Sequence, residues 1–102
     1  MIIEYIRYSG IDAARTKDFL AAYETAAESL RGSSHCLGYE LTRCTEAKVC
    51  FTLRIQWDSE DGHLKGFRTS AEFKPFFVAV KPYVGDIAEM RHYEITNLHW
   101  AR

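Results

Sequence analysis

The chain contains few of the residues that mark fibrous, disordered or secreted proteins. Only 2 of its 102 residues are proline and 6 are glycine, which excludes collagen-like and low-complexity chains. Its 3 cysteines form an odd set without C-x-x-C spacing, so we expect neither a disulfide framework nor a structural zinc site. The apolar runs are too short for a membrane span or a signal peptide. These absences favour a protein of the cytoplasm.

The chain also lacks an excess of positive or negative charge. Thirteen Lys and Arg stand against 14 Asp and Glu, for a net charge of -1, so the basic surface that a nucleic-acid partner needs is missing. The 47% of hydrophobic residues and 14% of aromatic residues indicate one globular domain. A domain of this size buries roughly two thirds of its unfolded surface, and oligomerisation would extend its core.

Hydrophobic periodicity predicts four strands and three helical segments. Asp12 is the expected N-cap of the first helix and Gly32 its left-handed C-terminal residue. Ser59 and Ser70 are the expected caps of two later helical segments, the second of which ends before Pro82. The predicted elements are strands at 2–8, 36–44, 49–58 and 86–95, a helix at 13–31, and helical segments after residues 59 and 70.

The second and third strands are expected to form a hairpin whose register can be tested. If Cys44 lies opposite Cys50, one face pairs Thr42 with Thr52 and Glu40 with Arg54. The other face then pairs Leu41 with Leu53, Tyr39 with Ile55 and Leu37 with Trp57. Every pair is chemically compatible, which a slip of one residue would destroy.

The order β-α-β-β-α-β predicts an α+β, ferredoxin-like fold, with an antiparallel sheet and helices on one of its faces. We expect one domain at 1–95 and a tail at 96–102. The other sheet face is expected to carry a mixed polar set rather than lysines, and we expect it to meet a second copy in a homodimer. That set is Glu40, Thr42, Arg54, Gln56, Glu89 and Tyr93.

The second half of the chain carries a family resemblance. The segments Trp57-Asp58-Ser59-Glu60, Gly62-His63-Leu64, Glu72-Phe73 and Phe76-Phe77, with Phe67 and Ser70 between them, resemble the antibiotic biosynthesis monooxygenase superfamily of dimeric α/β barrels. The resemblance extends from Glu4-Tyr5-Ile6-Arg7 to Met90-Arg91-His92-Tyr93. It implies a pocket between helices and sheet in each subunit. Members include cofactor-free oxygenases of anthrones and quinols, haem-degrading enzymes, and proteins without a known activity.

The resemblance also implies which side chains face the pocket. From the strands these are Ile6, Tyr8, Tyr39, Leu53, Ile55, Trp57, Met90 and His92, and from the helical segments His63, Phe67, Phe73 and Phe77. Two departures narrow the chemistry. The iron-ligating histidine and the asparagine of the haem-degrading branch correspond to Phe77, or its neighbour Phe76, and to Ile6. The asparagine that binds a substrate oxygen in the anthrone-oxidising branch corresponds to Leu53.

The chemistry expected from these residues is cofactor-independent oxygenation of a small aromatic phenol, quinol or anthrone, with O2 as co-substrate. The anion of such a compound reacts directly with O2. The protein therefore supplies an apolar pocket without water, a base, and a hydrogen-bond donor to the substrate oxyanion. His63 is the first candidate for the base and His92 the second. Trp57 would stack on the ring, and Tyr8 or Tyr39 would donate to the substrate oxygen. Leu53, Phe67, Phe73, Phe77 and Met90 are the remaining expected substrate contacts. We expect no metal, flavin or nicotinamide.

Each candidate also has a structural interpretation. Trp57 and the phenylalanines are equally compatible with core packing, and His63 with exposure to solvent. His92 is compatible with a hydrogen-bonded core position, and Glu40 with a structural pair to Arg54. A disulfide between Cys44 and Cys50 is disfavoured in a reducing compartment. Two other functions stay open: a binding module without turnover, and a cofactor-free isomerase or decarboxylase-like enzyme acting on a carbonyl compound.

Overall fold

The computed structural model describes residues 1–102 and contains one four-stranded sheet packed against helices. A π-helical segment, η1, precedes α2, and a 3-10 segment, η2, follows it. The elements in chain order are β1 (Ile2–Tyr8), α1 (Ala13–Gly32), β2 (Cys36–Arg43), β3 (Phe51–Trp57), η1 (Gly62–Phe67), α2 (Phe73–Val80), η2 (Lys81–Asp86) and β4 (Ile87–Glu94).

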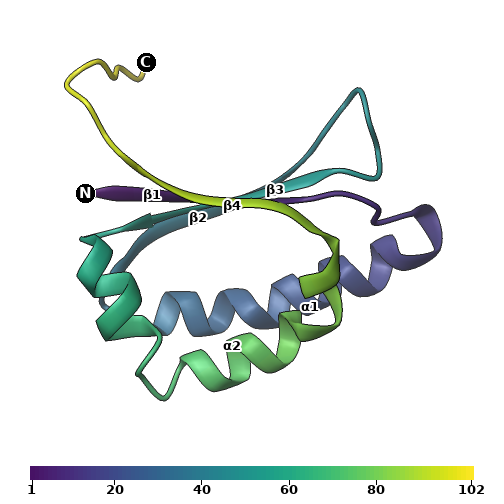
Figure 1. Cartoon of the computed structure of the whole chain (residues 1–102), viewed down its shortest axis with the longest axis horizontal. Coiled ribbons are helices and arrows are strands. Elements are labelled where there is room, and N and C mark those ends of the chain that lie inside the picture. The colour runs from purple at the N-terminus through teal and green to yellow at the C-terminus, as the bar shows by residue number, and fades with distance from the viewer.

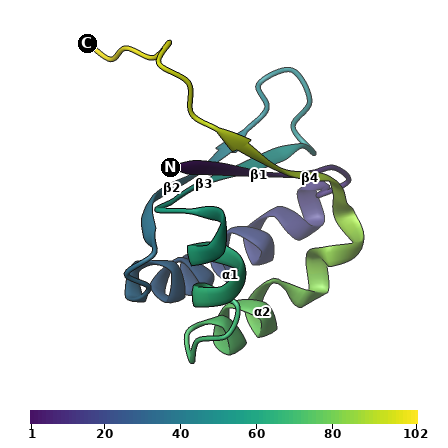
Figure 2. The same ribbon diagram turned by 60° about the vertical axis from the view of Figure 1, so that its left-hand side comes forward.

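The sheet has the strand order β2-β3-β1-β4, and every neighbouring pair is antiparallel. Both helices lie on the same face of this sheet, and its opposite face carries no helix (Figure 1; Figure 2). The two central strands, β1 and β3, alternate buried and more exposed side chains over most of their length. This arrangement confirms the predicted α+β, ferredoxin-like fold.

The predicted hairpin register is confirmed over most of its length. Thr42 pairs with Thr52, Leu41 with Leu53, Glu40 with Arg54 and Tyr39 with Ile55. The Cys44 amide donates to the Cys50 carbonyl at 2.9 Å, and all three cysteines are free thiols.

The expected pairing of Leu37 with Trp57 is wrong. The register shifts between Cys36 and Gly38, so Cys36 takes the position opposite Trp57. Leu37 is left 51% exposed. A bulge of this kind inserts one unpaired residue into a strand, and no pattern of side-chain chemistry in the pairs before it reveals where the insertion falls.

Only some of the predicted helix ends are correct. The Asp12 carboxylate accepts a hydrogen bond from the Arg15 amide at 3.1 Å, as a cap should. Gly32, however, is the last helical residue and has no positive φ, because α1 ends through an extended Ser33. The Ser70 hydroxyl donates to the Phe67 carbonyl at 2.6 Å rather than capping α2, which begins at Phe73 without a side-chain cap. The helix ends at Val80, before Pro82, as predicted.

The core lies between the sheet and the two helices. Phe19 of α1 is its central ring and contacts Tyr8, Tyr23, Phe51 and Tyr83 at centroid distances of 4.9 to 5.2 Å. These rings prefer edge-to-face and tilted contacts because their faces and edges carry opposite partial charges. The five rings therefore join β1, α1, β3 and η2 in one aromatic core.

The C-terminal residues 95–102 leave the sheet and extend away from the body of the molecule (Figure 1; Figure 2). Leu98 and Trp100 are among the most exposed hydrophobic side chains of the chain. None of the helices combines the length and the apolar character that crossing a bilayer demands.

Replacing Leu53 by alanine should lower the free energy of unfolding by about 3 kcal/mol, because Leu53 is 1% exposed and its truncation leaves a cavity in the core. The matched control is Leu37→Ala, which should cost less than about 0.5 kcal/mol because Leu37 lies in the bulge, largely in water. Urea denaturation measures both changes. Equal losses for the two variants would contradict the register of β2 against β3.

Candidate functional site

A cavity of about 220 Å³ lies between the sheet and the segments η1, α2 and η2. Most of its wall is hydrophobic, and its polar groups gather beside η1 and the start of β1. The lining residues are Glu4, Ile6, Tyr8, Tyr23, Ile55, Trp57, His63, Phe67, Arg68, Phe73, Phe76, Phe77, Val80, Val84, Ile87 and Met90.

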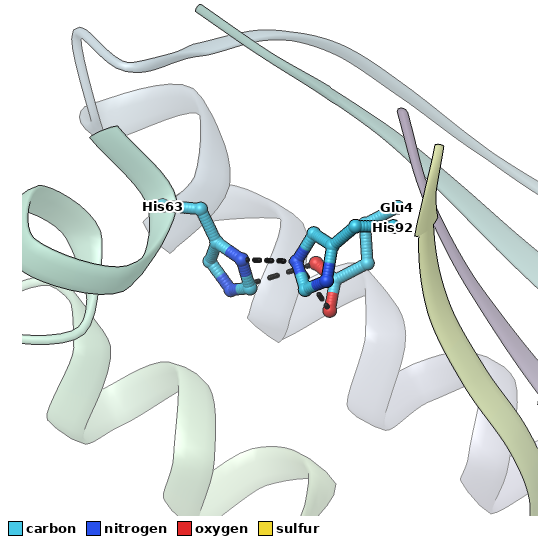
Figure 3. Close-up of side chains that lie close together, drawn as sticks. All are labelled: Glu4, His63 and His92. Carbon is cyan, nitrogen blue, oxygen red and sulfur yellow. Dashed lines mark hydrogen bonds and ion pairs between the residues drawn. The ribbon is translucent and has the colours of Figure 1, made fainter. Parts of the chain in front are cut away.

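Four side chains form a polar cluster at this end of the cavity. The Trp57 indole N–H donates to Glu4 Oε1 at 3.0 Å. The rings of His63 and His92 share a hydrogen bond between Nδ1 and Nε2 at 2.8 Å. Glu4 approaches His63 Nε2 at 3.5 Å and His92 Nε2 at 3.9 Å. Figure 3 shows the two imidazoles and the carboxylate turned toward one another. The carboxylate therefore connects three aromatic nitrogen groups.

Sheet pairing places two members of the cluster side by side. Glu4 of β1 is the register partner of His92 of β4. On its other side, β1 pairs with β3, where Ile2 lies opposite Trp57. Because alternate residues of a strand face the same side, Glu4 faces the helices together with Ile6 and Tyr8. The carboxyl group is consequently 2% exposed, in a layer that is otherwise apolar.

His63 reaches the cluster from η1 rather than from the sheet. Its ring stacks on the Trp57 indole at a centroid distance of 4.5 Å and an interplanar angle of 12°. Two glycines let η1 approach this closely. A Cβ on Gly66 would lie 2.5 Å from the ring of His35, and a Cβ on Gly62 would overlap the Asp58 carboxylate. The imidazole is therefore held at 4% exposure by close backbone packing.

Burial shifts the ionisation of the cluster toward its neutral forms. Burial, together with the charges of Arg68 and His92, lowers the pKa of His63 to about 4. Burial raises the pKa of Glu4, against the opposing effects of the Trp57 hydrogen bond and of the charges on His92 and Arg68. His63 is thus neutral at pH 7 and has a lone pair available on one ring nitrogen.

A second polar pair, formed by the hydroxyl groups of Tyr8 and Tyr23, lines the cavity. The two groups hydrogen-bond to each other. Burial raises the pKa of Tyr8 to about 12 and also raises the pKa of Tyr23. Both tyrosines therefore stay protonated. One hydroxyl donates to the other, which leaves the second hydroxyl's proton for an oxygen of a bound molecule.

The cluster also has the donor set of a metal site. One ligand atom from each of Glu4, His63 and His92 lies within 4.8 Å of the other two. Two imidazoles and a carboxylate are ligands that zinc and non-haem iron accept, usually with open positions for substrate. The Trp57 N–H would then hold the Glu4 ligand in place. These three residues are the ones that could hold a divalent cation.

The model of one protein family, antibiotic biosynthesis monooxygenase, matches residues 1–79. This chain belongs to that family. The family match covers β1, α1, the hairpin and η1, together with most of α2, so it includes the elements that supply Glu4, Trp57 and His63.

Two solved structures and one curated protein are similar to this chain. A solved structure from Bordetella bronchiseptica, which is named for the family, is 28% identical and has a TM-score of 0.72. The match covers 93% of this chain and 96% of that one. A conserved protein from Methanosarcina mazei Go1, 18% identical with a TM-score of 0.76 and coverage of 93% and 92%, shares the fold. The uncharacterized protein YczJ of Bacillus subtilis (strain 168) is 22% identical over 78 residues, which are 76% of this chain and 82% of YczJ.

The structure gathers most of the residues that the sequence nominated for the site. Nine of them line the cavity: Ile6, Tyr8, Ile55, Trp57, His63, Phe67, Phe73, Phe77 and Met90. His92 lies next to His63 without lining the cavity itself. Tyr39 and Leu53 lie outside it. Leu53 is a core residue, and the Tyr39 hydroxyl accepts a hydrogen bond from Arg31.

Two polar residues of the cavity, Glu4 and Arg68, are not predicted from the sequence. A signal for Glu4 exists: it occupies the same strand face as Ile6 and Tyr8, where a carboxylate needs a partner. No comparable signal exists for Arg68, because its place depends on a π-helical turn that residue periodicity does not reveal. Both groups act electrostatically on His63 or lie close to it.

Removing the His63 imidazole should make folding less sensitive to acid. Because the folded pKa of about 4 lies below the unfolded value of about 6.5, the unfolded state binds more protons between these values. Wild-type stability should therefore fall by about 3 kcal/mol from pH 7 to pH 4 through this group. His63→Gln should lack that contribution, whereas His99→Gln, in the exposed tail, should retain it.

Urea denaturation from pH 4 to pH 8 measures this difference. The raised pKa of Glu4 acts in the opposite direction, since it lowers stability as the pH rises from about 4.5 through the folded value. That contribution is present in wild type and in the His99→Gln control. Parallel stability curves for wild type and His63→Gln would show that His63 is not held neutral by burial.

Proposed function

We propose that the protein is a cofactor-independent monooxygenase of a small aromatic phenol, quinol or anthrone. The observation that carries this proposal is an apolar cavity with a buried neutral imidazole, a carboxyl group and a second imidazole at one end. Membership of the antibiotic biosynthesis monooxygenase family supports an oxygenase, and the cavity supports the class of substrate.

The cavity walls favour a flat, apolar molecule. Trp57, Phe67, Phe73 and Phe77 present aromatic rings to the same space, and such rings bind a planar substrate by offset stacking or by edge contacts. A cavity of about 150 Å³ in another protein binds benzene. The 220 Å³ here therefore supports an aromatic substrate larger than benzene.

The proposed reaction begins when His63 accepts a proton from the substrate. The neutral imidazole has one unprotonated ring nitrogen, and the neighbouring Glu4 carboxyl and His92 ring can share the charge that forms. The side chain of His92 is 22% exposed, so it offers the proton a path to solvent. A hydroxyl of Tyr8 or Tyr23 would donate a hydrogen bond to the substrate oxyanion.

The electron balance of this reaction needs no external reductant. A deprotonated anthrone or phenol transfers an electron to O2, and the two radicals combine to form a carbon–oxygen bond. Loss of water from the resulting peroxide converts a CH2 group into C=O, so one oxygen atom enters the product and the other leaves as H2O. The substrate supplies all four electrons that reduce O2. The protein contributes a site without bulk water, which protects the anion from reprotonation.

The uncovered face of the sheet supports the proposal of a homodimer. Tyr5 and Tyr93 are exposed there and contact each other at a centroid distance of 5.4 Å. Arg54 and Glu40 form a cross-strand pair on the same face, so two copies related by a twofold axis can match opposite charges. The three free thiols support placement in a reducing cytoplasm.

Purified protein treated with a chelator should consume O2 when it is given anthrones, dihydroxynaphthalenes or menadiol. His63→Gln should lower the rate above the spontaneous reaction by about 10² or more, because the base is lost. His99→Gln should leave it unchanged. An oxygen electrode measures the rate, and Trp57→Phe tests the hydrogen bond to Glu4.

Each other outcome of the oxygen assay points to a different function. Uptake that disappears on chelation and returns with a metal would contradict the cofactor-free mechanism. Saturable binding of the same compounds without uptake would favour a binding module. Proton exchange into a carbonyl compound without O2 would favour an isomerase.

Sedimentation should give a dimer at micromolar concentration. Replacement of exposed Tyr93 by glutamate puts an unpaired charge into the proposed interface and should shift the protein toward the monomer. The matched control is Val78→Glu, on α2, which is exposed on the helical side and should leave the dimer intact. A wild-type monomer would contradict the role assigned to this sheet face.

A further inference from the structure

Arg68 lines the cavity and is also exposed to solvent. Thirteen of the 16 lining residues are hydrophobic, and the other three are Glu4, His63 and Arg68. A guanidinium group keeps its charge at every physiological pH, so Arg68 is the only fixed positive charge that a bound molecule would meet.

The π-helical turn of η1 explains why Arg68 reaches the cavity. Its amide donates to the His63 carbonyl at 3.1 Å, which is the i→i+5 bond of a π turn. This wider turn brings residues 63 and 68 to the same side of the segment. In a regular α-helix, five residues at about 100° each would place them about 140° apart. Arg68 and the proposed base are therefore presented together, one turn apart.

The Arg68 side chain has no protein partner. It makes no hydrogen bond or ion pair with another side chain, whereas Arg15 holds Asp86. Arg7 and Arg54 also lack such a partner, but only Arg68 lines the cavity. The positive charge of Arg68 nevertheless lowers the pKa of the proposed base, His63, and is second only to burial among the causes of that shift. An arginine that lines a cavity, with all five N–H groups free of protein acceptors, is available to a carboxylate of a ligand.

We propose that Arg68 binds a carboxylate on the substrate, so that the cavity selects hydroxylated aromatic acids over neutral aromatics of the same shape. This inference rests on the proposed function only where it calls the bound molecule a substrate. The binding of a carboxylate by Arg68 does not depend on that function. Because Arg68 and His63 leave η1 one turn apart, about 5 Å, the carboxylate and the reacting hydroxyl lie on the same edge of the ring system. Arg68 thus directs the hydroxyl toward His63.

Calorimetric titration without oxygen tests the proposal with two probes, 1-hydroxy-2-naphthoate and its uncharged carboxamide. Wild-type protein should bind the carboxylate at least about 10-fold more tightly, as expected for a charge-assisted pair. Arg68→Gln should bring the ratio to about 1 by weakening the carboxylate alone. Unchanged carboxamide affinity in this variant shows that the cavity is still folded. Arg68→Lys should keep part of the preference.

The matched control is Lys65→Gln, which removes one positive charge from the same segment at a side chain that does not line the cavity. It should retain the wild-type ratio. An equal loss in Lys65→Gln would show a general effect of net charge, and an unchanged ratio in Arg68→Gln would overturn the proposal. Oxygen uptake is measured separately, so selective binding without uptake would refute the oxygenase and not the role of Arg68.

Discussion

The buried carboxyl group of Glu4 is the constraint on which the site depends. An ionised group in an apolar layer is costly unless it finds hydrogen bonds or is neutralised. Glu4 meets this requirement through the Trp57 indole N–H at 3.0 Å and through its proximity to two imidazoles. Trp57, in turn, supports His63 by stacking. β1, β3, β4 and η1 each contribute one member, so the sheet and the helical layer must be assembled before any of the four side chains has its partners.

The same burial that stabilises the layer also prepares its chemistry. Desolvation keeps His63 neutral and raises the pKa of Glu4, so the proposed base carries a lone pair rather than a proton. Arg68, in contrast, carries a guanidinium group that keeps its positive charge. Together they divide the cavity into an aromatic wall, a proton-accepting end and an anion-binding position. This division is what the proposed oxygenation of a hydroxylated aromatic acid requires.

The sequence pattern predicts the structure best in regular strands, where side chains alternate and each residue has a partner on the next strand. The alternation in β1 and β3 and the chemical pairing of Glu40 with Arg54 predicted the strands and their register. The predicted pairing is wrong at Leu37, where a bulge breaks the alternation. The predicted helix ends are wrong at Gly32 and Ser70, because a helix can end or begin through more than one backbone conformation. In the site, nine of the residues expected to face the pocket line the cavity, and Tyr39 and Leu53 do not. Tyr39 lies on the edge strand β2, where its hydroxyl accepts a hydrogen bond from Arg31, and Leu53 is a core residue.

By itself, the sequence determined the order of the elements and the apolar and polar faces of the sheet. These properties depend on local spacing, which a strand or a helix converts directly into direction. Only the tertiary structure decided that Glu4, 53 residues before Trp57, is its partner, and that a π turn carries Arg68 to the side of His63. Both depend on how distant segments pack and on backbone hydrogen bonds, and neither leaves a periodic trace in the order of the residues.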